Sequence, residues 1–418
     1  MERGVKECCG LNIKSVSFAE LFLNKTMFIA YALLAIGLIG WFELFGLRFG
    51  HEFVNTANLV EAGGIKEHTG MMAEALKEQI FNMHHIEEVP REEPWGIFVA
   101  QYTYLLYGGS ALIFLVALAE LAGLHIAHKA SAALMTLGIS LALGGMVSIA
   151  SDWGNPINIY WMILNPQPQS GMWMMLPLYS IYIPFTFIEI YFLMTNKREL
   201  AKKLALPLVV IGLGIDMAEF YIQGILFQLN DARHLWTDFP ALWIYFLLTG
   251  ALSGVAFAMI YSGLALKDKS WKAELDETLK KAAMVLIVLV GIYEAVAGFG
   301  KIGEAPFTTM FWGYIIIGLV LPLGLLAVNQ NFLAGILIAI GTFAARELFV
   351  YGGNAEPMTN RFGMGPEAIS PYSVASIEEV IYRAPHAMEV MVIIACVGVG
   401  IAIFKLLDTL LDVSNQPH

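Results

Sequence analysis

The chain has 418 residues, of which 58% are hydrophobic and only 14% charged, with a formal net charge of −11. Soluble proteins carry roughly 25% charged residues, so this composition excludes an ordinary soluble domain. The negative charge argues against nucleic acid as a partner.

Apolar runs long enough to cross a bilayer recur along the chain, and each run of about 20 residues predicts a spanning helix. The sequence therefore predicts an all-α integral membrane protein with about ten transmembrane helices, in contact with membrane lipid. The first run lacks a short apolar core with a cleavage site, so we expect a retained helix rather than a signal peptide. The predicted spans are residues 25–46, 94–122, 129–150, 171–194, 204–227, 239–266, 280–299, 307–327, 329–350 and 386–408.

Lys and Arg concentrate in alternate loops, chiefly the leader and residues 195–203 and 267–281. Such loops usually face the cytoplasm, which predicts a cytoplasmic-membrane protein with both termini inside. Two long loops, residues 47–93 and 351–385, then face outward. Ordered loops of this length are usually functional, and we expect both to form an outer docking surface.

The helices predicted second to fifth resemble those predicted sixth to ninth. Tyr-Leu-Leu-Tyr-Gly-Gly at 104–109 corresponds to Tyr-Phe-Leu-Leu-Thr-Gly at 245–250, and Glu-Phe-Tyr-Ile-Gln-Gly at 219–224 to Glu-Leu-Phe-Val-Tyr-Gly at 347–352. Both units begin outside, so the repeat is parallel. It predicts two four-helix bundles with one additional helix at each end.

This repeat divides the chain into four parts. The first comprises the leader, the first helix and the long outer loop, and the last comprises an outer loop, the last helix and the tail. The predicted parts are residues 1–93, 94–238 for the first bundle, 239–350 for the second bundle, and 351–418.

Polar side chains fall inside several predicted helices, where ionisable groups are costly and usually functional. One set lies near the predicted outer face, and a second set lies deeper or near the inner face. The outer set is Gln101, Tyr104, Asp152, Glu219, Tyr221 and Trp236, and the deeper set is Glu120, Glu189 and Asp216.

Quinol oxidation is one chemistry that fits the outer set. It needs hydrogen bonds to two ring oxygens and a base for each departing proton. We expect Tyr221, with Gln101 or Tyr104, to bind the ring oxygens. Asp152 or Glu219 would then accept the protons.

A proton relay is the second chemistry. It needs carboxylates at successive depths, and Glu120, Glu189, Asp216 and Glu219 supply them. The alternative is that buried polar groups pair with one another as structural ties.

The structural alternative is strongest at two places. Arg346 and Glu347 are adjacent, so they point about 100° apart on a helix and are expected to pair with different neighbours. Asp152 precedes Gly154 and Pro156 and can equally be a polar residue at a helix end.

No bound metal centre is expected in this chain. An iron–sulfur cluster usually takes four cysteines, whereas Cys8, Cys9 and Cys396 are the only three present. A haem within the bundle would need histidines buried on facing helices, and His125 and His128 lie at a helix end.

Three ordered stretches carry a family resemblance. Residues 94–109 contain Pro-Trp-Gly and paired glycines. Residues 152–173 contain Asp-Trp-Gly-Asn-Pro, Trp-Met and Ser-Gly-Met-Trp, and residues 221–240 contain Tyr-Ile-Gln-Gly, Leu-Trp and Pro. Together they resemble the NrfD-type quinone-reactive membrane subunits, which include the polysulfide reductase membrane subunit. Asn155, Gly171 and Thr237 depart from the family pattern.

The resemblance implies a menaquinone pocket at the outer face, beneath a docked ferredoxin-like iron–sulfur subunit. The family's tyrosine falls on Tyr221 and its acidic residue on Asp152. The ten helices and acidic outer loops most resemble the DsrP-type subgroup of complexes linked to dissimilatory sulfite reductase. That likeness adds cytochrome b, multihaem cytochrome c and cytoplasmic iron–sulfur subunits as candidate partners.

The function expected from this resemblance is electron exchange between menaquinol and an iron–sulfur partner in sulfite or sulfate respiration. One alternative is a secondary transporter or a proton-translocating subunit without quinone chemistry, because internal repeats and buried carboxylates also suit transporters. A membrane anchor that binds no quinone is a further alternative.

Overall fold

The computed structural model describes residues 5–8, 11–14, 16–42, 95–152, 160–194, 198–229, 234–237, 241–266, 270–297, 305–355 and 387–414. The predicted outer loop 47–93, most of the loop 351–385, and Cys9 lie outside these residues.

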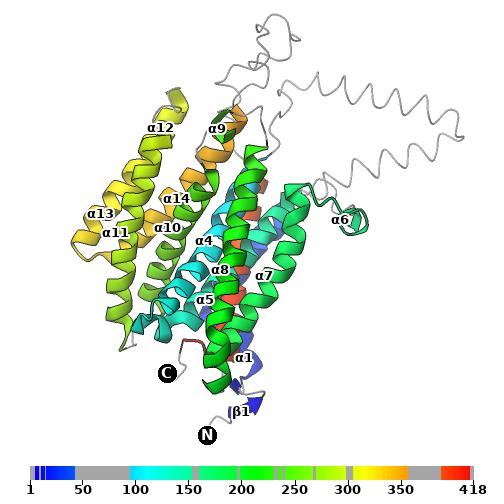
Figure 1. Ribbon diagram of the computed structural model, residues 1–418, viewed down its shortest axis with the longest axis vertical. Coiled ribbons are helices and arrows are strands. Elements are labelled where there is room, and N and C mark those ends of the chain that lie inside the picture. Colours follow the sequence, from blue (N-terminus) through cyan, green and yellow to red (C-terminus); the bar gives the residue numbers. More distant parts are fainter. Residues whose placement is uncertain are drawn as a thin grey trace, which may run out of the picture.

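Long helices dominate the described chain and run roughly parallel to one another (Figure 1). The leader forms an antiparallel hairpin of β1 (Val5–Cys8) and β2 (Leu11–Lys14), followed by the short α1 (Phe18–Phe22). The next helices are Lys25–Phe42, α4 (Ile97–Leu121), α5 (His125–Asp152), α6 (Tyr160–Leu164), α7 (Gly171–Met194), α8 (Arg198–Gln228) and α9 (His234–Thr237).

The second half of the chain also consists mainly of long helices. One of them is interrupted by a π-helical segment, η2 (Ile315–Val320). The elements are α10 (Leu242–Ala265), α11 (Lys272–Ala297), α12 (Ala305–Tyr314), η2, α13 (Leu321–Ala327), α14 (Asn331–Ala355) and α16 (Ala387–Leu411).

Nine of the described helices are long and apolar enough to cross a membrane, which confirms an all-helical, multi-pass membrane protein. Nine of the ten predicted spans have a counterpart among these helices, and the predicted span 280–299 does not. That segment forms the second half of α11, where Lys280, Lys281 and Glu294 make the run less apolar. Helices prevail because lipid offers the backbone no hydrogen-bond partner, so each segment must satisfy its own amides.

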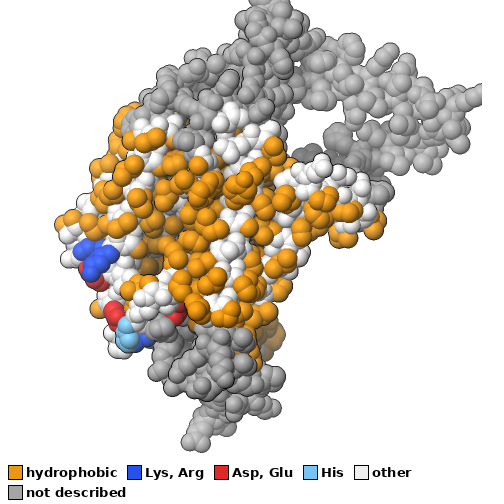
Figure 2. All heavy atoms as spheres, viewed as in Figure 1, with side chains coloured by type: hydrophobic (Ala, Val, Ile, Leu, Met, Phe, Trp, Pro, Cys, Tyr) orange, Lys and Arg blue, Asp and Glu red, His pale blue; other side chains and the backbone are white. Residues whose placement is uncertain are grey.

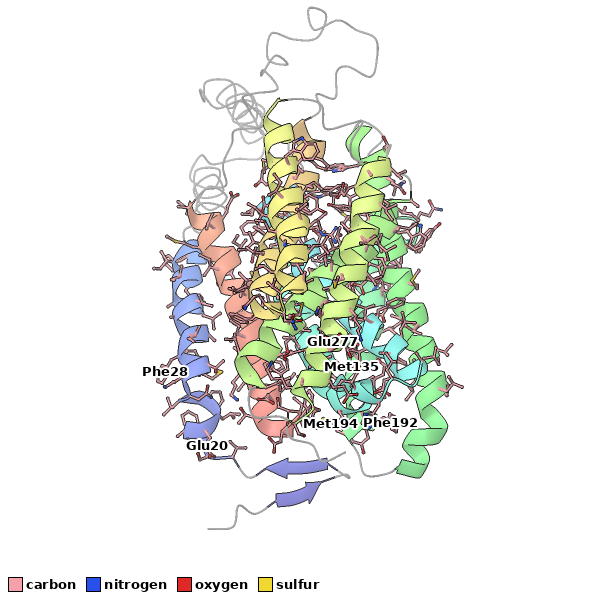
Figure 3. The ribbon with its side chains drawn as sticks, turned by 90° about the vertical axis from the view of Figure 1, so that its left-hand side faces the viewer. Glu20, Phe28, Met135, Phe192, Met194 and Glu277 are labelled. Carbon is pink, nitrogen blue, oxygen red and sulfur yellow. The ribbon has the colours of Figure 1, made fainter. Side chains whose placement is uncertain are left out.

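The outer surface agrees with a membrane location. Hydrophobic side chains cover most of the visible described face, and charged side chains gather near its lower end (Figure 2). Phe28 of helix Lys25–Phe42 points away from the bundle and is 56% exposed (Figure 3). Met194, at the end of α7, lies at the same end of the bundle as Glu277 near the start of α11 (Figure 3).

The helices of the two halves pack in a reciprocal manner. In the first half α4 packs against α5 and α8, and in the second half α10 packs against α11 and α14. Between the halves α4 contacts α10 and α14, while α10 contacts α4 and α8. Duplication of a four-helix unit would produce such an arrangement, and we retain the division into bundles 94–238 and 239–350 as a proposal.

Glycines allow the central helices to approach closely. A Cβ at Gly109 would lie 2.2 Å from the Gly138 carbonyl oxygen of α5, and one at Gly254 would lie 2.4 Å from the Gly108 carbonyl oxygen of α4. Small residues serve this role in membranes because helix association there depends on close van der Waals packing. The α4–α10 contact therefore depends on the absence of side chains.

Gly254→Ala is expected to lower the thermal unfolding temperature of the purified protein. The added methyl group must push α10 away from α4, and such overpacking typically costs about 1–3 kcal/mol. Gly291→Ala on α11 is the matched control, since nothing lies within 4 Å of its added Cβ. Equal unfolding temperatures for the two variants would contradict the close contact.

Candidate functional site

A buried polar stripe runs along α8. It consists of Asp216, Glu219 and Gln223, which are at most 1% exposed. Their spacing of three and four residues places them on one face of the helix, together with Gly212. From Gly212 to Gln223 the stripe extends about 16 Å along the helix axis.

Two other helices present polar residues to this stripe. Tyr179, Tyr182, Thr186 and Glu189 recur at helical spacing on α7, and all four are buried. The facing residues of α4 are Tyr102, Tyr107 and Ser110, which are also buried. We call the set the polar column, comprising Tyr102, Tyr107, Ser110, Tyr179, Tyr182, Thr186, Glu189, Asp216, Glu219 and Gln223.

Hydrogen bonds join the upper part of the column. The Tyr107 hydroxyl donates to Gln223 Oε1 at 2.7 Å, and the Tyr102 and Tyr179 hydroxyls lie 3.1 Å apart. Glu219 Oε1 accepts from Ser110 at 3.1 Å and from Tyr179 at 3.3 Å. The second carboxyl oxygen of Glu219, Oε2, is buried and has no hydrogen-bond partner among the described residues.

The lower part of the column holds two further carboxyl groups. Asp216 lies close enough to Tyr182 and Glu219 to interact with them electrostatically. Glu189 covers Gly212, where an added Cβ would meet its Oε1 at 2.6 Å. Asp216 Oδ1 and Glu189 Oε1 are buried without hydrogen-bond partners among the described residues.

The column contains three acids and no base. Among the described residues the only buried Lys or Arg side chain is Arg346, which lies on α14 in the second half. Isolated buried charges are expensive, and carboxyl groups in such surroundings commonly take up a proton instead. The column therefore has the composition of a path along which protons can be held and passed on.

An aromatic cluster closes the column beyond Gln223. Phe227 follows one turn later on α8, and its ring centroid lies 4.7 Å from that of Trp95 and 5.2 Å from that of Trp236. Trp236 is fully buried, and its indole Nε1 donates to the Phe349 carbonyl at 2.9 Å. Trp236, predicted as part of the site, thus lies beside the end of the column.

Gln101 and Tyr104, predicted to bind a quinone ring, bond helices other than α8. The amide of Gln101 donates to the Ile393 carbonyl of α16 at 2.8 Å. The Tyr104 hydroxyl donates to the Ala339 carbonyl of α14 at 2.8 Å. The structure does not bring these two side chains together with Glu219.

The remaining predicted residues are distributed along the bundle. Tyr221 is 56% exposed and lies on the outward side of α8, away from Glu219. Asp152 ends α5 and is half-buried, and Glu120 is half-buried near the end of α4. Of the predicted set, Glu189, Asp216 and Glu219 share the column.

Sequence reasoning missed the hydroxyl and amide groups around Glu219. The signal was available in the sequence: Tyr179, Tyr182 and Glu189 share a helical face, as do Glu219 and Gln223. These residues form a site only because the polar face of α7 packs against the polar face of α8, and the sequence does not show that packing.

No group of three or more His, Cys, Asp or Glu residues within the described part of the chain is arranged to hold a metal ion. The column instead offers hydroxyl donors beside a carboxyl oxygen, Glu219 Oε2, that has no hydrogen-bond partner within the described part of the chain. These are the groups required to bind a quinone carbonyl or to accept a proton from a quinol.

Comparison with known proteins identifies the family. Residues 84–357, more than half of the chain, match the family model described as polysulphide reductase, NrfD. The chain belongs to this family. No curated protein matches the sequence.

The matched region of this NrfD-family chain contains the whole polar column and the aromatic cluster. Family membership makes the chain a multi-pass membrane subunit of a quinol-linked oxidoreductase complex. Members of the family typically bind quinone and work with an iron–sulfur partner subunit. The residues around Glu219 fit such a ligand, since they combine hydrogen-bond donors with an available carboxyl oxygen.

Proposed function

We propose that this subunit exchanges electrons between menaquinol or menaquinone and an iron–sulfur subunit docked at the outer face, in the respiration of sulfur compounds such as sulfite. The observation that carries the proposal is the buried cluster of Tyr107, Tyr179, Gln223 and Glu219 within an NrfD-family chain. The DsrP-like assignment, the cytochrome partners and the cytoplasmic termini belong to the same proposal.

Each residue of the cluster has a distinct task in this scheme. The Tyr107 hydroxyl donates to Gln223 Oε1 at 2.7 Å, and the Tyr179 hydroxyl donates to Glu219 Oε1 at 3.3 Å. Each has a single proton to donate, so each would exchange its present acceptor for a ring oxygen when the quinone binds. Glu219 accepts a proton at its buried Oε2, while Ser110 holds the other carboxyl oxygen in place. Menaquinol, when bound, supplies the electrons and protons.

Proton movement follows the column away from Glu219. Asp216 lies one turn deeper on α8, and Glu189 on α7 lies deeper still, beside Gly212. Tyr182 of α7 lies close to Asp216. This series of carboxyl groups supports the predicted relay, and Glu120 remains a proposed member at its inner end.

Quinol chemistry can also be placed on the lipid-facing side of α8, where Tyr221 is exposed. Tyr221 and Glu219 point about 200° apart around the helix, so a single ring cannot readily touch both. We favour the buried side because it combines hydroxyls, an amide and a carboxyl group within hydrogen-bonding distance of one another.

Tyrosine-to-phenylalanine substitutions separate these placements. Tyr107→Phe is expected to weaken binding of a quinone analogue to the intact complex by about two- to tenfold, the worth of one hydrogen bond. Tyr104→Phe removes a hydrogen bond that the same helix makes to the Ala339 carbonyl of α14, and we expect it to leave affinity unchanged. Affinity is measured by inhibitor titration of quinol-dependent electron transfer.

The results distinguish three outcomes. Loss of quinone-analogue affinity in Tyr107→Phe alone would support binding of the quinone at the buried cluster. Loss confined to Tyr221→Phe would move the quinone to the lipid-facing side of α8. Substrate uptake by the isolated chain in liposomes, without quinone-dependent activity in the complex, would favour the transporter alternative.

A further inference from the structure

The second half of the molecule contains a buried acid and a buried base that do not form an ion pair. Glu294 of α11 is 3% exposed, and Arg346 of α14 is 1% exposed. They are close enough for their charges to attract, yet they form no salt bridge. Each side chain is instead held by other groups.

Glu294 is held by a tyrosine. The Tyr314 hydroxyl donates to Glu294 Oε1 at 3.2 Å. Tyr314 is the last residue of α12 and directly precedes η2. π-Helical segments alter the direction of neighbouring side chains and are frequent at functional sites, which suits a tyrosine placed to meet a buried acid.

Arg346 is held mainly by aromatic rings. Its guanidinium carbon lies 4.6 Å from the Phe246 ring centroid and 5.1 Å from that of Tyr245, and Nη2 donates to the Phe246 carbonyl at 3.3 Å. Nη1 is buried and has no hydrogen-bond partner among the described residues. The two aromatic rings and the Phe246 carbonyl therefore hold the guanidinium in place without a direct ion pair to Glu294.

A purely structural pair would be arranged differently. Buried ion pairs offset their desolvation only when the geometry is close and the remaining polar atoms are satisfied. Arg–carboxylate pairs achieve this with two short parallel hydrogen bonds. The separation of Glu294 from Arg346, with Nη1 unsatisfied, leaves the carboxyl group free to gain and lose a proton beside a fixed charge.

We propose that Glu294 is a second proton-binding site of this protein, with Arg346 as its fixed counter-charge and Tyr314 as its hydrogen-bond partner. The ligand is a proton: the carboxylate becomes a carboxylic acid, and the net charge of the pair changes from zero to +1. The titratable groups close to Glu294 are Tyr314 of α12, Tyr245 of α10 and its neighbour in sequence, Tyr293.

This site lies next to the polar column of the first half. The Phe246 ring, on which Arg346 rests, is 5.5 Å from the ring of Tyr107. Arg346 and Tyr107 are also close enough to interact electrostatically. A change of charge at Glu294 would therefore alter the electrostatic potential at the Tyr107 hydroxyl, which donates to Gln223.

Infrared spectroscopy of the purified full-length chain in lipid nanodiscs tests the site without relying on electron transfer. A pH titration should show a buried carboxylic acid band that Glu294→Gln removes. Tyr314→Phe, a conservative change, should move the band because the carboxyl group loses a hydrogen bond. Arg346→Gln should leave a larger protonated fraction at a given pH, whereas Arg346→Lys should restore the wild-type fraction.

Glu347→Gln is the control, since Glu347 neighbours Arg346 in sequence but lies near Glu389 of α16. It should leave the Glu294 band in place. A spectrum in which folded Glu294→Gln loses no titrating band would overturn the proposal, as would a Glu294 band insensitive to both Tyr314→Phe and Arg346→Gln. These readouts are independent of quinone activity, so the proposed function can fail while this site stands.

Discussion

Glu219→Gln is expected to reduce quinol-dependent electron transfer in the intact complex by about 10²-fold or more. General acid–base groups typically contribute 10²–10⁴-fold, and this substitution removes proton acceptance while preserving shape. Glu219 is fully buried, and its Oε2 is the carboxyl oxygen without a partner in the cluster. The rate is measured with a soluble menaquinol analogue and an electron acceptor for the partner subunits.

The matched control is Glu347→Gln, the same substitution in the corresponding motif of the second half. Glu347 lies on α14, outside the polar column, and a nearly unchanged rate is expected. A normal rate in a correctly assembled Glu219→Gln complex would remove Glu219 from the chemistry. Equal losses in both variants would indicate a general effect of removing buried acids.

Asp216→Asn is expected to slow electron transfer by roughly tenfold or more while leaving quinone-analogue affinity unchanged. Asp216 lies below the cluster, so it affects the departure of protons rather than the binding of the ring. Its Oδ1 is buried without a hydrogen-bond partner among the described residues. Proton release and electron transfer are measured together in proteoliposomes that contain the complex.

Thr186→Val is the control for the lower column. Thr186 lies within the column but has no ionisable group, and among the described residues its hydroxyl donates to the Tyr182 carbonyl of its own helix, so its removal should change neither the rate of proton release nor that of electron transfer. If Asp216→Asn weakened analogue binding as strongly as Glu219→Gln, Asp216 would belong to the binding site. If Asp216→Asn changed neither the electron-transfer rate nor the analogue affinity, protons would leave Glu219 by another path.

The family was accessible from three short ordered motifs, and the matched residues 84–357 confirm the NrfD assignment. The finer likeness to the DsrP-type subgroup is untested and stays a prediction. The motifs were informative because their order was preserved over several helices, although no single one was distinctive.

The candidate site was only partly predictable. Glu189, Asp216 and Glu219 were recognisable because acids are rare inside apolar runs and therefore conspicuous. Tyr107, Tyr179 and Gln223 were not, since tyrosine and glutamine are common in such helices and gain meaning only from their neighbours. Tyr221 was selected by its motif, but it lies on the exposed side of α8.

The sequence by itself determined that the chain forms long membrane-spanning helices. The reason is physical: lipid compels each apolar run to satisfy its own backbone, so length and composition suffice to predict a helix. Only the tertiary structure decided which face of each helix turns inward. The inward and lipid-facing sides are almost equally apolar, so hydrophobic periodicity cannot orient them, and Glu219 meets Tyr179 only because α7 and α8 pack together.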